Sequence, residues 1–252
     1  MVLFSRLIRR SAVVAAALPT AAFAHDFFLL PSAGGERTTI VATVGSSFPK
    51  PEVAVTPDRV ATARAATSAG PVDVRIGAVS GVTLPIAIGP AKQPVVASVT
   101  LKPRDVEYRD DRIDLIMGEY PVGPQAKAAV AGLPRPRVLK VDSRRFAKTA
   151  VCTGRCTGLA SIPAQGLELE FVAVADGRFR LLQNGSPVAG HEAIVATADG
   201  KRQHVTTNAQ GELVPPADAS GPTMLFASTM ASPSTPDGRF ILRLTSFTLG
   251  SR

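Results

Sequence analysis

Short apolar and β-branched runs, each bounded by proline or glycine, are the feature that most constrains the fold of this chain. Four of them, at residues 38–44, 72–76, 83–88 and 95–101, lie in the first part of the sequence. The 252 residues include 21 Gly and 21 Pro, which interrupt helices and favour turns between short strands. The pattern therefore predicts an all-β protein and argues against a helical bundle.

The second part of the sequence repeats this pattern more densely. Six further runs follow Gly166, at residues 167–174, 178–182, 191–198, 201–207, 223–229 and 239–248. The dipeptide Asp199-Gly200 between two of them predicts a hairpin with a two-residue turn. We therefore predict two immunoglobulin-like or transthyretin-like β-sandwich domains, at residues 25–165 and 166–252. We expect the second domain to fold without the first.

A helical pattern interrupts the first predicted domain near residues 110–131. Ile113, Ile116 and Met117 recur at helical spacing, and Asp110 can complement the helix dipole in the first turn. Residues 125–131 predict a second short helix. We interpret this segment as a short helical insertion between strands of the first domain.

The first 24 residues have the pattern of a secretory signal peptide. Three arginines precede the apolar residues 11–18, and Ala22-Phe23-Ala24 is a cleavage site of the A-x-A type. The Arg9-Arg10 pair raises a twin-arginine signal as the alternative, but its flanking residues fit poorly. Cleavage after Ala24 removes three basic residues and lowers the net charge from +8 to +5. We expect export to a bacterial periplasm without a membrane span, because no apolar run reaches about 18 residues.

Cleavage after Ala24 makes His25 the first residue of the mature chain. Its free amine and its imidazole Nδ1 can together chelate one transition metal, and such nitrogen ligands suit Cu(II) or Ni(II). Asp26, His191 and His204 are the sensible additional ligands, because the chain has only three histidines. The alternative is that His25 and Asp26 simply begin a strand.

The predicted hairpin constrains how His191 and His204 can contribute to a metal site. A two-residue turn at Asp199-Gly200 places Val195 opposite His204, and His191 lies four residues from Val195 on the same face. At about 3.3 Å per residue, the two histidines are roughly 13 Å apart and cannot share one metal. We therefore expect at most one of them to join His25.

Residues 135–148 form the most basic stretch of the chain. One acidic residue, Asp142, stands among six basic residues, which are Arg135, Arg137, Lys140, Arg144, Arg145 and Lys148. One interpretation is a solvated strand and loop. The other is a docking surface for lipid headgroups or for an acidic envelope partner such as a transporter. We do not expect a nucleic-acid partner, because the protein is predicted to be exported and no stacking aromatics interleave these charges.

Cys152 and Cys156 are the only cysteines of the chain. In an exported protein, this isolated pair predicts a local disulfide that closes a turn around Gly154. The alternative is a reduced pair of thiols that binds Cu(I).

Four stretches of the sequence resemble one bacterial family. The predicted mature start reads AHDFFLLP at residues 24–31, and residues 144–150 read RRFAKTA. In the second part, residues 184–190 read NGSPVAG and residues 207–211 read TNAQG. These motifs resemble the periplasmic domain-of-unknown-function family 4198. Members of that family end in a transthyretin-like module and have been described as periplasmic parts of nickel or cobalt uptake.

The resemblance implies a periplasmic accessory protein that binds a metal and works with a transporter. Members often carry histidine at the position of Ser46 and within residues 227–230, where this chain has none. Enzyme motifs are also missing from the sequence, which has no nucleophile elbow, phosphate-binding loop or zincin helix. We therefore predict a non-catalytic exported protein that binds copper or nickel through His25. The alternative is a metal-free interaction module that docks an envelope partner.

Overall fold

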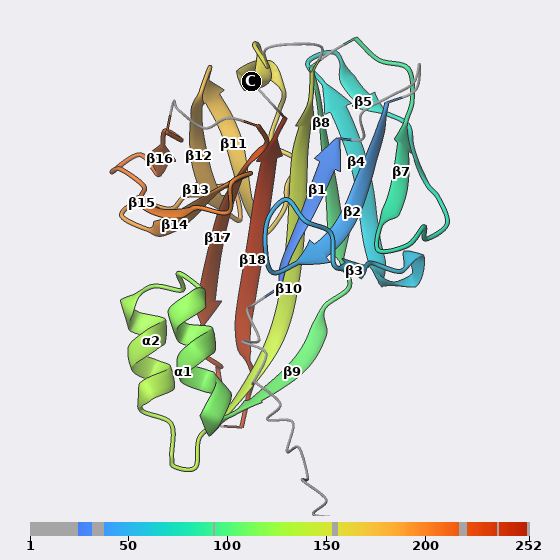
Figure 1. The fold of residues 1–252 in the computed structure, drawn as a ribbon. Helices are drawn as coiled ribbons and strands as arrows, with labels where there is room; N and C mark the ends of the chain where they lie inside the picture. The colour runs from blue at the N-terminus through green and yellow to red at the C-terminus, as the bar shows by residue number, and fades with distance from the viewer. Residues whose placement is uncertain are drawn as a thin grey trace, which may run out of the picture.

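A long mixed sheet forms the middle layer of the protein (Figure 1). The computed structural model describes residues 25–31, 38–92, 94–152, 156–216, 221–235 and 237–250, and within these ranges the sheet has nine strands. The predicted signal peptide, residues 1–24, lies outside the described residues. The strand order is β15 (Arg202–Thr206), β14 (Glu192–Thr197), β17 (Thr223–Ala231), β18 (Phe240–Leu249), β10 (Val138–Val151), β8 (Val95–Leu101), β4 (Val60–Thr67) and β5 (Gly70–Val72), with β9 (Arg104–Arg109) paired to the first half of β10.

Two smaller sheets cover opposite faces of this central sheet. One contains β1 (Asp26–Pro31), β2 (Thr39–Gly45), β3 (Val53–Ala54), β6 (Val74–Ile76) and β7 (Leu84–Ile88). The other contains β11 (Leu169–Ala175), β12 (Arg178–Gln183), β13 (Ser186–Pro187) and β16 (Glu212–Leu213). Alternate residues of β10 pack into two different hydrophobic clusters, one on each face of the central sheet. Ala147 packs with residues of β1 and β2, whereas Phe146 packs with residues of β11 and β12.

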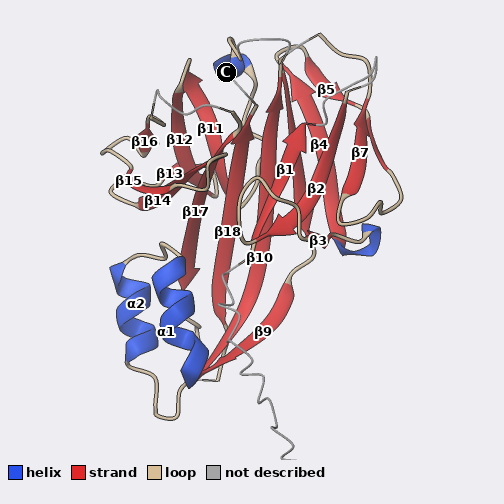
Figure 2. Ribbon diagram, in the orientation of Figure 1, coloured by secondary structure: helices blue, strands red, loops and turns tan. Residues whose placement is uncertain are grey.

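Two short helices lie at one end of the central sheet (Figure 2). They are α1 (Asp110–Glu119) and α2 (Pro124–Ala131), and they form the predicted helical insertion. Ile113 and Ile116 of α1 are buried in the same cluster as Leu139 of β10 and Phe226 of β17. The other helical turns are η1 (Pro57–Arg59) and η2 (Leu159–Ser161).

The prediction of an all-β sandwich fold with a short helical insertion is thus confirmed. Among the described residues, no helix is long and apolar enough to cross a membrane.

The central sheet crosses the predicted domain boundary between residues 165 and 166. Its strands β4, β5, β8, β9 and β10 precede the boundary, and β14, β15, β17 and β18 follow it. The two parts meet where β10 and β18 pair in parallel, from Val141 opposite Phe240 to Ala150 opposite Leu249. The two sandwiches therefore share one sheet and are not separate units. The expectation that residues 166–252 fold alone is revised for this reason.

The predicted strand positions agree with most of the observed strands, and β8 spans the predicted residues. The run at residues 72–76 is an exception, because it divides into the end of β5 and the whole of β6, which belong to different sheets. The sequence analysis did not predict β4 or β9. β4 is rich in alanine, and β9 places charged residues on both of its faces, so neither has the usual apolar alternation.

Candidate functional site

His25 lies exposed at the start of β1, beside a carboxylate. Its Nε2 is 3.8 Å from Oε2 of Glu52, and its side chain is 45% exposed. The guanidinium of Arg145, on β10, donates a hydrogen bond of 2.9 Å to the carbonyl oxygen of His25. The central sheet therefore holds the backbone of His25 and leaves its imidazole open to solvent.

Glu52 is held in place by Ser46. The backbone N–H of Ser46 donates to Oε2 of Glu52 at 2.9 Å, and the Ser46 hydroxyl lies 3.0 and 2.8 Å from the two carboxylate oxygens. These hydrogen bonds lower the pKa of Glu52, and the nearby His25 acts in the same direction. Glu52 is therefore an anion at neutral pH. The sequence analysis missed it, because a lone glutamate between Pro51 and Val53 carries no motif.

Asp26 does not share the solvent-exposed face of His25. Its side chain is 1% exposed, and Nη1 of Arg202 donates to its Oδ2 at 2.6 Å. Burial raises the pKa of Asp26, whereas Arg202 opposes that shift. Arg202 also lies 5.8 Å from the ring centre of Phe226. The pair ties β1 to β15, and a buried carboxylate that already has a cation makes a poor metal ligand.

The hairpin between β14 and β15 differs from the predicted one by one residue. The N–H of Thr197 donates to the carbonyl oxygen of Lys201 at 3.0 Å, which makes the turn three residues long. The predicted two-residue turn is therefore wrong, and His204 lies opposite Ile194. His191 precedes the first residue of β14, so the strand register does not fix the direction of its side chain.

Each of these two histidines has a partner of its own. Nε2 of His191 lies 2.8 Å from the carbonyl oxygen of Ser228. Nδ1 of His204 lies 2.5 Å from Oε1 of Glu192, and the His204 side chain is 55% exposed. Within the described part of the chain, no group of three or more His, Cys, Asp or Glu side chains is placed to hold a metal ion. The four predicted ligands therefore do not form one cluster.

The predicted basic stretch is distributed over both faces of β10 and the segment before it. Four of its six side chains are engaged: Arg137 with Asp110 and Asp114, Arg144 with Asp142 and Glu168, Arg145 with the His25 carbonyl oxygen, and Lys148 with Glu170. Arg135 has a 3.3 Å contact with Asp110, but its side chain is 74% exposed. Lys140 is also exposed. A docking surface on this stretch would therefore consist mainly of Arg135 and Lys140.

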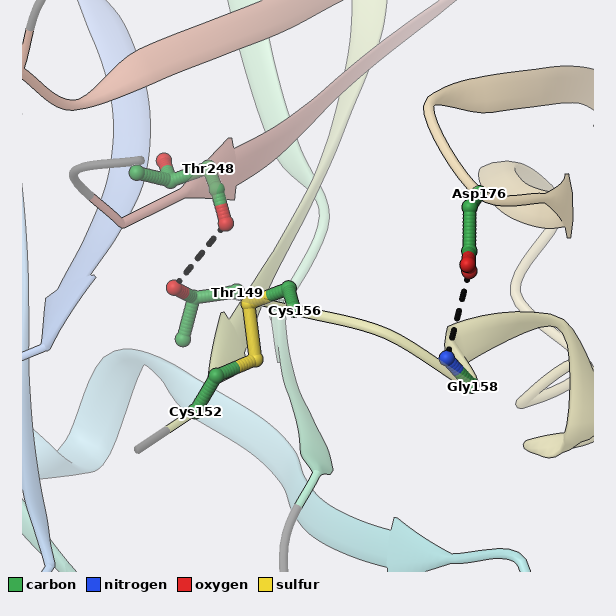
Figure 3. Close-up of a disulfide and its surroundings, with 6 residues drawn as sticks. All are labelled: Thr149, Cys152, Cys156, Gly158, Asp176 and Thr248. Atoms are coloured by element: carbon green, nitrogen blue, oxygen red, sulfur yellow. Dashed lines mark hydrogen bonds between the residues drawn. A yellow bond between two sulfur atoms is a disulfide. The ribbon is translucent and has the colours of Figure 1, made fainter. Parts of the chain in front are cut away.

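Cys152 and Cys156 form a disulfide just after the end of β10, as predicted (Figure 3). At the end of β10, the hydroxyl of Thr149 donates to the carbonyl oxygen of Thr248 at 3.1 Å. Residues 153–155, including the predicted turn at Gly154, lie outside the described residues. Because the two sulfurs are bonded to each other, this structure offers no thiol pair for Cu(I) at these positions.

No family model, curated protein or solved structure matches this chain. The resemblance to family 4198 therefore stays a prediction from short motifs. The motif at the predicted mature start forms β1, and NGSPVAG forms a turn and the short strand β13. The functional proposal consequently rests on the geometry around His25.

Proposed function

We propose that this chain is an exported, non-catalytic accessory protein that binds a divalent transition metal, copper or nickel, at His25 of the processed chain. The observation that carries this proposal is the approach of Nε2 of His25 to within 3.8 Å of Glu52. Export is supported by the signal-peptide pattern of residues 1–24. The Cys152–Cys156 disulfide supports it too, because disulfides persist mainly in oxidising compartments.

Glu52 favours Nδ1 as the imidazole nitrogen that is left for a metal, through a charge 3.8 Å from Nε2 and without a hydrogen bond. A negative charge beside Nε2 favours the tautomer that carries the proton on Nε2. The lone pair then lies on Nδ1 of His25. That nitrogen is the one that closes a six-membered chelate ring with the free amine of the same residue.

This site has an open coordination sphere. His25 supplies two nitrogens, and the remaining positions are left to water, to a small ligand or to a side chain of another protein. The guanidinium of Arg145 lies against the His25 carbonyl oxygen and disfavours a second positive charge nearby. Binding is therefore weak and exchangeable, which suits transfer of a metal to a partner such as a transporter.

Metal titration of the processed chain tests the proposal. Protein that begins at His25 is titrated calorimetrically with Cu(II) and Ni(II), beside a matched form with a Gly-Ser extension before His25. The extension moves the free amine away from the imidazole, so most of the affinity should be lost. Cu(II) should bind more tightly than Ni(II), because nitrogen sites follow the Irving–Williams order.

Two substitutions distinguish the role of Glu52 from a general effect of charge or histidine content. Glu52→Gln should weaken Cu(II) binding by about fivefold, because two unit charges about 4 Å apart in water interact by about 1 kcal/mol. His204→Ala should leave binding unchanged, because His204 is paired with Glu192 on another strand. Equal Cu(II) affinity in the extended and processed forms would refute the site and favour the metal-free interaction module.

A further inference from the structure

A cavity of about 510 Å³ opens beside His25, where β3 and η1 approach β9 and β10. Four basic side chains line it, contributed by three different parts of the chain: Arg59, Lys102, Arg104 and Arg145. No acidic residue is among the described residues that line the cavity. We propose that this cavity binds a small organic anion that carries at least two carboxylate or phosphate groups.

The alternation of β9 makes one of its faces basic. Arg104, Val106 and Tyr108 line the cavity. Asp105 and Glu107 fall on the other face and approach Arg239, at 3.3 and 3.9 Å. The two acidic residues of β9 are therefore turned away from the cavity, and Arg104, one of its two arginines, is turned toward it.

Two of the cavity cations are positioned without being neutralised. Nη2 of Arg59 donates to the carbonyl oxygen of Lys102 at 2.8 Å, and Nη1 of Arg145 donates to that of His25 at 2.9 Å. A carbonyl oxygen fixes a guanidinium but carries no net charge, so the positive charges remain available to a ligand. Arginine held in this way suits carboxylate or phosphate, because its fork of N–H donors matches their oxygens.

Two carboxylates border the cavity and reduce its charge without cancelling it. Glu52 lies beside His25. The pKa of Asp58 is lowered by a hydrogen bond from Thr56, and Lys102 and Arg59 add to that shift, so this carboxylate is also charged. The four basic side chains still outnumber these two carboxylates.

The remaining polar groups of the lining are hydroxyls, and the volume of the cavity indicates the size of the ligand. Tyr108 and Ser143 offer donors for oxyanions. Burial raises the pKa of Tyr108, although Arg145 and Arg104 oppose the shift, so its hydroxyl remains a donor at neutral pH. The volume lies in the range of about 300–1,000 Å³ that is usual for small-molecule sites. It therefore suits an organic molecule with several anionic groups better than a single inorganic phosphate.

The binding test uses metal-free protein, so that it is independent of the metal site proposed above. Processed protein is treated with a chelating resin and titrated calorimetrically with citrate, a sugar bisphosphate, inorganic phosphate and, as a neutral control, glycerol. EDTA is avoided because it is itself a polycarboxylate. Citrate or the sugar bisphosphate should bind more tightly than inorganic phosphate, and the affinity should fall as NaCl screens the charges.

Tyrosine fluorescence locates the binding without a label. The chain has no Trp and two Tyr. Tyr120 is 2% exposed in the core near α1, whereas Tyr108 lines the cavity. A ligand in the cavity should therefore change the emission of Tyr108 alone. In Tyr108→Phe the fluorescence change should disappear, while calorimetry should still detect binding.

Charge-removal variants decide whether the cavity is the site. Lys102→Ala and Arg104→Ala should each weaken binding about tenfold, in keeping with one lost charge-assisted hydrogen bond. Lys102→Ala retains the backbone contact that holds Arg59. Lys127→Ala, on the exposed face of α2, removes the same charge elsewhere and should have no effect.

Three results would overturn the proposal. One is that neither citrate nor the sugar bisphosphate binds. Another is that Lys127→Ala weakens binding as much as Lys102→Ala or Arg104→Ala, which would show that net charge alone is responsible. The third is that inorganic phosphate binds as tightly as the organic anions, which would indicate a site for a single oxyanion. None of these outcomes depends on whether His25 holds a metal.

Discussion

Breaking the buried ion pair between Lys148 and Glu170 is expected to destabilise the protein far more than breaking an exposed one. Nζ of Lys148 lies 2.7 Å from Oε2 of Glu170 and 2.8 Å from the carbonyl oxygen of Phe171. Both side chains of the pair are 2% exposed. The ammonium also lies 5.5 Å from the ring centre of Phe247. Each charge is therefore out of water and depends on the other for its stabilisation.

The two partners are not equivalent, because Glu170 makes more contacts than Lys148. Its oxygens accept hydrogen bonds from the backbone N–H groups of Gln165, Gly166 and Leu167, at 3.1, 2.9 and 3.3 Å. Lys148→Met retains those bonds but leaves a buried carboxylate without its cation, which costs about 3–5 kcal/mol. Glu170→Ala also leaves the three donors without their acceptor, at about 1–3 kcal/mol for each that stays buried, so its effect should be larger.

Thermal and urea unfolding, followed by circular dichroism, measure these differences. In a chain of this length, 1 kcal/mol shifts the melting temperature by about 2–4 °C, so Lys148→Met should melt about 6–20 °C lower. The matched control is Lys201→Met. It breaks the exposed pair with Asp199, in which Lys201 is 82% exposed, and should cost less than about 1 kcal/mol. Equal melting temperatures for the two variants would refute the reasoning.

Two further predictions concern the helical insertion and the shared sheet. The hydrogen bond from Arg137 lowers the pKa of Asp110, so the stabilisation is complete above the usual pKa of an aspartate and is lost as the pH falls through the lowered one. The melting temperature of the native protein should therefore drop more than that of Asp110→Asn when the pH is lowered from about 5 to about 3. A fragment that begins at Gly166 should give a poorly dispersed amide spectrum, because β18 loses its partner β10; a well-dispersed spectrum would show that the second part folds alone.

Strand positions can be predicted from this sequence, but strand partners cannot. Alternation is a property of each run by itself, and β8 and β17 begin at the expected residues. The pairing of β10 with β18 joins residues about 100 positions apart in the chain. Both strands are buried on both faces over most of that pairing, so their patterns carry no information about a neighbour. The prediction of two separable domains is a consequence of this missing information.

Only those features of the candidate site that depend on residues adjacent in the sequence can be predicted from it. His25 can be identified from the sequence because it follows a cleavage pattern. Glu52 can be identified only from the structure, because the pairing of β1 with β2 brings it beside His25. Charge counting treats residues 135–148 as one basic surface. Burial of Lys148 depends on Glu170, which is 22 residues away, so composition alone does not reveal it.

The anchoring of the first residues of β1 is the structural feature on which the proposed role of His25 depends. The first residues of a domain are poorly ordered unless tied down. Here the Ser246 hydroxyl donates to the carbonyl oxygen of Phe27 at 2.7 Å, Arg202 binds Asp26, and Arg145 binds the His25 carbonyl oxygen. These three partners come from three different strands of the central sheet. The sheet therefore fixes the backbone of His25 while its imidazole stays exposed beside a basic cavity, and both proposed sites require this arrangement.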